Sequence, residues 1–143
     1  MNTIKFLEWV LPPEGVYVLF RNSLVQGRHR QSYFHSLEDL AEAADYYDSE
    51  GWDTYFAVSN YKKEGTRKGE DAGKIKAFFL DLDCGVGKEF STKKAALQEL
   101  QQFCTTTTLP KPLIVDSGRG LHVYWVLSEP VAVEQWKPVA EQF

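Results

Sequence analysis

The chain has 143 residues, and its 16 lysines and arginines stand against 20 aspartates and glutamates, which gives a formal charge of −4. With 43% hydrophobic and 14% aromatic residues it can build a core, so a disordered chain is excluded, and the length fits one domain.

The sequence predicts no membrane span and no secretion. The longest apolar run, Val16–Phe20, is far shorter than the roughly 20 residues that cross a bilayer. The first five residues do not form a signal peptide, and two cysteines do not make a disulfide framework. We therefore expect a cytoplasmic protein, in the bacterial host if a phage or plasmid encodes it. The slight acidity argues against coating nucleic acid by bulk charge, but it leaves room for local basic loops.

The first part of the chain predicts alternating helices and strands. An apolar helical period ends at Pro12, and a polar turn around Gln26-Gly27 separates two short strands. Ser36 can cap a helix that stops near Gly51. The expected ranges are Ile4–Leu11 (helix), Val16–Phe20 and Gln31–Phe34 (strands), Ser36–Glu50 (helix) and Asp53–Ser59 (strand).

Residues 61–76 form a polar, glycine-containing stretch with six basic and three acidic side chains. We interpret it as a basic mobile loop or a hairpin. Its candidates for contact with nucleic acid are Lys62, Lys63, Arg67 and Lys68, to which the segment with Arg21, Arg28 and Arg30 is added.

The second part predicts a strand, a helix, a hairpin and a last helix. Thr105–Thr108 is interpreted as a loop or the lead-in to a strand. Pro138 is tolerable in the last helix only if it falls in or near the first turn. Because the amphipathic pattern still runs at Phe143, we expect the chain to be the front part of a longer one. The expected ranges are Ile75–Asp83 (strand), Ser91–Cys104 (helix, with Leu97 on its buried side), Leu113–Val115 and Leu121–Leu127 (strands) and Val133–Phe143 (helix).

The predicted fold class is α+β. A mixed or antiparallel sheet would carry the strand with Asp81 and Asp83 beside the hairpin, and the helices Ser36–Glu50 and Ser91–Cys104 would pack against it.

Asp81 and Asp83 are the strongest local indication of chemistry. Alternate residues of a strand share a face, so both carboxylates point the same way, roughly 6–7 Å apart. Such a pair can hold divalent cations, as two-metal phosphoryl transfer requires. The alternative is a solvated strand end.

The second indication is the segment from Asp116 to Trp125. Glycines at 118 and 120 allow close approach to a ligand, Ser117 offers a hydroxyl and Arg119 a fork of donors, so the turn could cradle phosphate. His122 follows on the face shared with Tyr124. Alone, this segment could equally be a hairpin turn with a surface histidine.

Together the two segments resemble the archaeo-eukaryotic primase superfamily, above all the primase-polymerases of phages and plasmids. The matching text is FFLDLDCGVGKEFS (residues 78–91) followed by LPKPLIVDSGRGLHVYWVLSEP (residues 109–130). A weaker match extends upstream to Gly15, so the resemblance covers most of the chain, and the two motifs are specific as a pair.

The resemblance implies the N-terminal part of a primase-polymerase catalytic domain with an RRM-like core. The activity would be template-directed nucleotidyl transfer in DNA replication, with Mg²⁺ or Mn²⁺ as cofactors, nucleoside triphosphates as substrates and single-stranded DNA as template. Asp81 and Asp83 would bind metal and His122 the phosphates of the nucleotide. The nucleotide pocket would also include Lys88 and Ser117–Gly120. A helicase domain or a replicative helicase is the usual partner in the family.

Two departures from the family pattern matter. Many members of the family have Ser-x-His, whereas this chain has Gly120 two residues before His122. The contact that the serine hydroxyl makes would here have to come from Ser117 or from a backbone N–H. The family's third motif is an acidic residue on a strand downstream of the second motif, and we expect this chain to stop before such a strand. Asp116, next to the second motif, is better explained as a residue that stabilises its own turn. The metal site therefore has two of its three usual carboxylates, which would leave this chain without activity of its own if the third is essential.

Two other functions remain open. The chain could be a non-catalytic module that binds nucleotides or single-stranded DNA. It could also be a phosphohydrolase with an aspartate nucleophile, although the threonine that such enzymes carry two residues after the second aspartate is Gly85 here.

Overall fold

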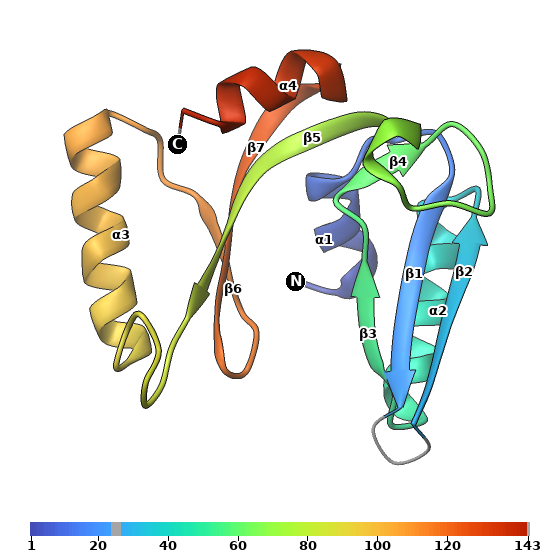
Figure 1. Ribbon diagram of the computed structural model, residues 1–143, viewed down its shortest axis with the longest axis horizontal. Coiled ribbons are helices and arrows are strands. Elements are labelled where there is room, and N and C mark those ends of the chain that lie inside the picture. Colours follow the sequence, from blue (N-terminus) through green and yellow to red (C-terminus); the bar gives the residue numbers. More distant parts are fainter. Residues whose placement is uncertain (24–26, 143) are drawn as a thin grey trace. The chain divides into compact units, whose positions relative to one another are not determined.

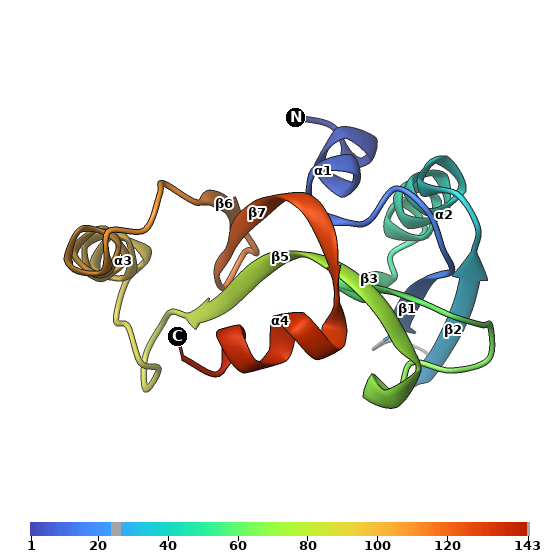
Figure 2. The same ribbon diagram turned by 90° about the horizontal axis from the view of Figure 1, so that it is seen from above.

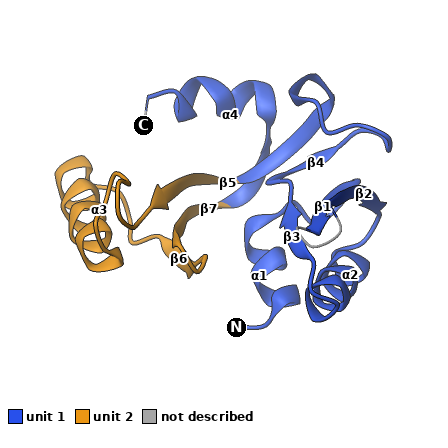
Figure 3. Cartoon of the chain, turned by 60° about the horizontal axis from the view of Figure 1, so that its bottom comes forward, with its two compact units in different colours: residues 1–76, 128–143 blue, residues 77–127 orange. Residues whose placement is uncertain are grey.

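A computed structural model describes residues 1–23 and 27–142. The described chain contains four α-helices, one 3-10 helix and seven strands, arranged as two compact units (Figure 3). The first unit comprises residues 1–76 and 128–143, and the second comprises residues 77–127. The length had led us to expect one domain. Over the described residues, no helix is both long and apolar enough to cross a membrane.

The first unit is built on a three-stranded antiparallel sheet in the order β2-β1-β3 (Figure 1). The predicted helix before Pro12 and the strands on either side of residue 27 are confirmed, although Gln26 of the predicted turn lies outside the described residues. The bounds are Thr3–Val10 (α1), Tyr17–Ser23 (β1), Arg28–Phe34 (β2) and Asp53–Phe56 (β3).

Helix α2 (Leu37–Ser49) begins as predicted, because the Ser36 hydroxyl accepts a hydrogen bond of 3.1 Å from the Asp39 N–H. The helix packs against β1, β2 and β3 through buried Leu37 and Leu40. The prediction that it covers the sheet with Asp81 was therefore wrong. An amphipathic stripe shows which face of a helix is buried, but not which sheet will cover it.

The predicted strand Asp53–Ser59 is interrupted after Phe56. Strand β4 (Ser59–Tyr61) instead pairs with β5 (Ala72–Asp83) in the other sheet. Residues 61–76 thus form a hairpin, which is one of the two structures that the sequence analysis predicted for them, the other being a basic mobile loop. Residues 72–76 belong to strand β5, and the 3-10 helix η1 (Gly69–Asp71) closes the connection.

The second sheet has the strand order β4-β5-β7-β6, with β6 (Leu113–Asp116) antiparallel to β7 (Gly120–Ala132). Within the second unit, β5 and β7 lie side by side, as predicted (Figures 1 and 2). Helix α3 (Lys93–Thr107) places Leu100 against Val123 and Trp125 in an apolar cluster. Burial of such side chains contributes roughly 1.5–3 kcal/mol each.

Helix α3 differs from its predicted form at both ends. Its cap is Thr92, whose hydroxyl accepts from the Ala95 N–H, and not Ser91. The run Thr105–Thr108 is helical up to Thr107, and the hydroxyls of Thr105 and Thr107 donate to carbonyl groups four residues earlier. Leu97, predicted on the buried side, is exposed.

The last elements also differ from prediction. Strand β7 continues beyond the Glu129-Pro130 pair that was expected to end it, and helix α4 spans Val133–Ala140. Pro138 lies inside this helix rather than near its first turn. Phe143, the predicted end of the helix, lies outside the described residues.

Asn60 joins three segments of the first unit. Its side chain is buried, donates 2.6 Å to the Glu14 carbonyl and accepts 2.6 Å from the Lys74 N–H. Gly15 and Gly73 make room for it, since a Cβ at either position would lie within 2.6 Å of the amide. The hairpin is thereby tied to the start of β1.

The substitution Asn60→Ala should destabilise the protein by roughly 1–3 kcal/mol for each backbone group left unpaired. The measurement is urea-induced unfolding followed by circular dichroism. Gln98→Ala, on the exposed side of α3, is the control and should change stability by less than about 0.5 kcal/mol. Equal stabilities of the two variants would show that Asn60 does not hold these segments together.

Candidate functional site

The two aspartates of β5 lie on the solvent-facing side of the second unit. Leu80 and Leu82 point to the apolar cluster under α3. Alternation along the strand then places Asp81 and Asp83 on the opposite face, where their side chains are 68% and 63% exposed. The sequence-based prediction that both carboxylates share one accessible face is consistent with this geometry.

His122 comes to the same face from the neighbouring strand. Its Nε2 lies 3.7 Å from Oδ1 of Asp81, and its side chain is 44% exposed. Strand β7 runs next to β5, so the two predicted motifs meet through sheet pairing and not through a flexible loop. One carboxylate and one imidazole can therefore act on the same ligand.

Tyr124 is a member of this face that the sequence analysis did not count as functional. The residue is buried, and burial raises the pKa of its phenol to about 12, with a further contribution from the negative charge of Asp81. Its place two residues after His122 indicated the shared face. Its closeness to Asp81 depends on strand order, which one sequence does not reveal.

Two lysines lie near the carboxylates of the second unit. Lys88 Nζ is 3.6 Å from Oδ2 of Asp83, an exposed pair worth at most about 1 kcal/mol. Lys93, which the sequence analysis did not single out, contacts Oδ1 of Asp116 at 2.7 Å. The hydrogen bond from Lys93, followed by that from the Gly118 N–H, holds the pKa of the Asp116 carboxyl below its usual range.

The turn between β6 and β7 uses most of its donors internally. The N–H of Ser117 donates to the Gly120 carbonyl, that of Gly118 to Asp116, and that of Gly120 to the Ser117 hydroxyl. Asp116 thus stabilises the turn, as predicted. The expectation that successive N–H groups cradle phosphate is wrong for these three. The turn can still offer the exposed Arg119 side chain and the Ser117 hydroxyl hydrogen.

Gly120 is required by close packing between strands. A Cβ at this position would lie 2.2 Å from the Leu82 carbonyl oxygen, a distance that no real contact permits. A serine at this position would not fit without a backbone shift. The Ser117 hydroxyl, 3.1 Å from the Gly120 nitrogen, lies beside that position instead.

The basic residues predicted to contact nucleic acid belong to the first unit. Lys62 and Lys63 lie 4.0 Å and 3.9 Å from the carboxylates of Glu134 and Asp71, in exposed or partly exposed pairs. The Arg67 guanidinium lies over the Phe20 ring. Lys68 is exposed, as are Arg28 and Arg30.

Arg21 has a structural role. Its guanidinium lies 3.9 Å from the centre of the Tyr47 ring and donates a hydrogen bond of 2.8 Å to Ser32. It is thereby held between β1 and α2.

The carboxylate pair fits a hard divalent cation in part. Mg²⁺ is often held by one or two carboxylates, with water and substrate phosphates completing its shell, and Asp81 and Asp83 can supply that number. In the part of the chain that the structure describes, no group of three His, Cys, Asp or Glu side chains is close enough to hold a metal ion. The residues therefore fit one ion better than two.

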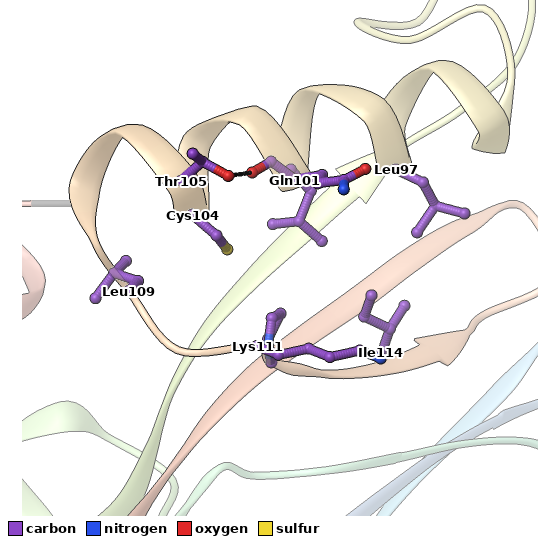
Figure 4. Close-up of a pocket in the computed structure, with 9 residues that line it drawn as sticks. Leu97, Gln101, Cys104, Thr105, Leu109, Lys111 and Ile114 are labelled. Carbon is purple, nitrogen blue, oxygen red and sulfur yellow. Dashed lines mark hydrogen bonds between the residues drawn. The ribbon is translucent and has the colours of Figure 1, made fainter.

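A separate groove of about 550 Å³ lies between α3 and β6 (Figure 4). Leu97, Cys104 and Ile114 line it, with Lys111 at its edge. It is on the α3 side of the sheet, whereas Asp81 and Asp83 are on the other. The groove is therefore not part of the candidate site.

No protein-family model, curated protein or solved structure matches the chain.

The substitution Gly120→Ala should destabilise the protein by roughly 1–3 kcal/mol, because the new methyl group overlaps the Leu82 carbonyl. Gly69→Ala is the matched control, since a Cβ there meets open space. Chemical denaturation of both variants is the measurement. If the two substitutions lower stability equally, the close approach of β7 to β5 is incorrect.

The substitution Asp81→Asn should lower the Tyr124 pKa from about 12, because it removes the nearby negative charge while burial still keeps the value above the ordinary 10. Between those two values the unfolded chain loses a phenol proton that the folded chain keeps, so stability falls as pH rises. Because the Asp81→Asn variant has a lower Tyr124 pKa in the folded state, the pH range over which its stability falls should be narrower than in the wild type. Carbon-13 NMR of labelled tyrosines, assigned with Tyr124→Phe, measures the pKa. Asp83→Asn is the control, and an unchanged Tyr124 pKa in Asp81→Asn would contradict the geometry.

Proposed function

We propose that this chain carries the nucleotide- and metal-binding site of a primase-polymerase that transfers nucleotides under the direction of a DNA template. The observation that carries the proposal is the meeting of Asp81, Asp83 and His122 on one accessible face of two paired strands. The resemblance to phage and plasmid primase-polymerases names the same three residues.

Each side chain has a defined task in this proposal. Asp81 and Asp83 hold the divalent ion, which when bound would activate the attacking hydroxyl and neutralise charge on the triphosphate. His122 donates a hydrogen bond to a phosphate oxygen from its position beside Asp81. Lys88, released from Asp83 when a cation arrives, supplies a second positive group.

The turn contributes shape and two donors. Because Gly120 carries no side chain, β7 can approach β5 closely and His122 is set against Asp81. Ser117 supports the proposal because its hydroxyl lies next to the position where many relatives carry a serine. Arg119 is exposed and available for a phosphate.

A second function is favoured by one observation. The described residues bring together two carboxylates and not three, which is enough to bind a metal-nucleotide complex but fewer than the family uses for transfer. The chain could therefore bind nucleotides without turning them over.

The double substitution Asp81→Asn/Asp83→Asn should abolish nucleotide addition, a loss of at least about 100-fold, because the ion that stabilises the transition state has lost its ligands. The assay uses the full chain with single-stranded DNA, labelled nucleoside triphosphates and Mn²⁺. Asp48→Asn/Glu50→Gln removes the same charge from the exposed end of α2 and should leave addition unchanged. Addition at the wild-type rate by the Asp81/Asp83 variant would overturn the proposal.

A binding measurement separates the two functions. Mn²⁺ broadens NMR signals of nearby nuclei, so it should broaden those of His122 and Tyr124 in the wild type and not in the double variant. Broadening together with metal-dependent nucleotide binding but no addition identifies the binding module. Absence of broadening excludes both functions.

A further inference from the structure

The three-stranded sheet of the first unit has two chemically different faces. Leu19, Thr54 and Phe56 point toward α1 and α2, and Arg21 lies over Tyr47 of α2. Alternation along the strands places their neighbours on the other face, namely Phe20, His29, Gln31 and Tyr55.

Aromatic rings gather on this second face. Phe20 is the cross-strand partner of Tyr55, and their ring centres are 6.0 Å apart. The His29 ring lies 6.1 Å from Phe20 on the other side. Tyr55 is 55% exposed and His29 is also exposed. We call Phe20, His29 and Tyr55 the ring platform.

The far end of the same face is closed by packing. Val18 is buried with Val16, Tyr61 and Ala72, and Tyr33 packs against this cluster. The ring platform is therefore the part of the face left open to solvent. A ring that only filled a core would not be more than half exposed, as that of Tyr55 is.

Positive charge accompanies the rings. The Arg67 guanidinium lies 4.6 Å from the centre of the Phe20 ring and is exposed. Lys68, also exposed, follows Arg67 in the hairpin, whereas Arg28 and Arg30 of β2 alternate with His29 and lie on the face that carries Arg21. The chain as a whole has a net charge of −4, so Arg67 and Lys68 form a local basic area on an acidic protein.

We propose that the ring platform, with Arg67, binds single-stranded nucleic acid by stacking unpaired bases on Tyr55 and His29 while the neighbouring cations contact the phosphates. Exposed aromatic rings on an antiparallel sheet are well suited to this, because every base has a flat face and a strand has phosphates at regular intervals. The proposal extends the proposed function, which requires a template, but it does not depend on catalysis.

Charge complementarity favours this occupant over a protein partner. The exposed rings of Tyr55 and His29 offer flat faces to bases, Arg67 and Lys68 offer charge to phosphates, and polar Gln31 between the rings interrupts the apolar area. Duplex DNA would present phosphates without accessible base faces. The platform should therefore prefer single strands to duplexes.

The test measures binding of fluorescein-labelled oligothymidylate by anisotropy, using the full chain in EDTA so that no metal site takes part. Tyr55→Ala should weaken binding roughly 5- to 150-fold, the range expected for loss of one stacked base, and Tyr55→Phe should restore it. The matched control is Tyr46→Ala, because Tyr46 is 58% exposed on α2 and is not on the platform. Arg67→Ala should weaken binding and reduce its dependence on salt.

The outcomes are distinct from those for the proposed function. Equal binding by the Tyr55→Ala and Tyr46→Ala variants, or equal affinity for duplex and single strand, overturns the platform even if Asp81 and Asp83 prove essential for nucleotide addition. Conversely, if the Asp81→Asn/Asp83→Asn variant adds nucleotides normally while Tyr55→Ala loses oligothymidylate, the platform stands and the proposed function fails. Circular dichroism of each variant confirms that the fold is intact, and Arg67→Ala, which leaves the rings in place, keeps the test decisive if Tyr55→Ala unfolds: unchanged binding and unchanged salt dependence of that variant would overturn the platform.

Discussion

Strand β5 has one face in an apolar cluster and the other face in solvent, and this difference places the residues of the candidate site. Leu80 and Leu82 pack under α3, and the period of two residues then forces Asp81 and Asp83 to the opposite face. Neither carboxylate could be buried without turning a leucine to solvent. Two like charges on one short face repel each other, and the repulsion is moderated by solvent, by Lys88 near Asp83 and by His122 near Asp81. A divalent cation would relieve it further, and the packing of the strand thus leaves exposed the carboxylate pair that the proposed function uses to hold metal.

The turn before β7 determines what stands opposite these carboxylates. Gly120 brings its backbone so near to Leu82 that no side chain fits between them. His122, two residues farther on, then falls beside Asp81. The turn is kept rigid by its own hydrogen bonds, in which the Asp116 and Ser117 side chains accept from the backbone. Together with the hydrogen bond from the Ser117 N–H to the Gly120 carbonyl, these bonds occupy three of the four N–H groups of the turn, which are therefore not available to a ligand. In the proposed function, the turn would therefore act by placing His122 and Arg119 and much less by binding phosphate through its backbone.

Local patterns predicted those features that depend on local physics. The Ser36 cap, the shared face of Asp81 and Asp83 and the hairpin around Gly118 all depend on residues close in sequence. The predictions were wrong where contacts between residues distant in the sequence determine the structure. A helix such as α2 has the same amphipathic stripe whichever sheet it covers, and the break after Phe56 that separates two sheets has no strong turn residue. The helical state of the threonine run was missed for a different reason, because the low helix propensity of threonine is a weak preference that the surrounding structure overrides.

The net charge of this chain says little about whether it binds nucleic acid. In the proposed function, carboxylates hold the metal ion that binds phosphates, so the second unit would be acidic where it meets a polyanion. A surface that binds unpaired bases by stacking draws most of its affinity from ring faces and needs only a few cations, which Arg67 and its neighbours supply. Neither surface requires a strongly basic protein. An overall charge of −4 is therefore compatible with a nucleic-acid partner, provided that recognition relies on bound metal and on bases rather than on the bulk field of the protein.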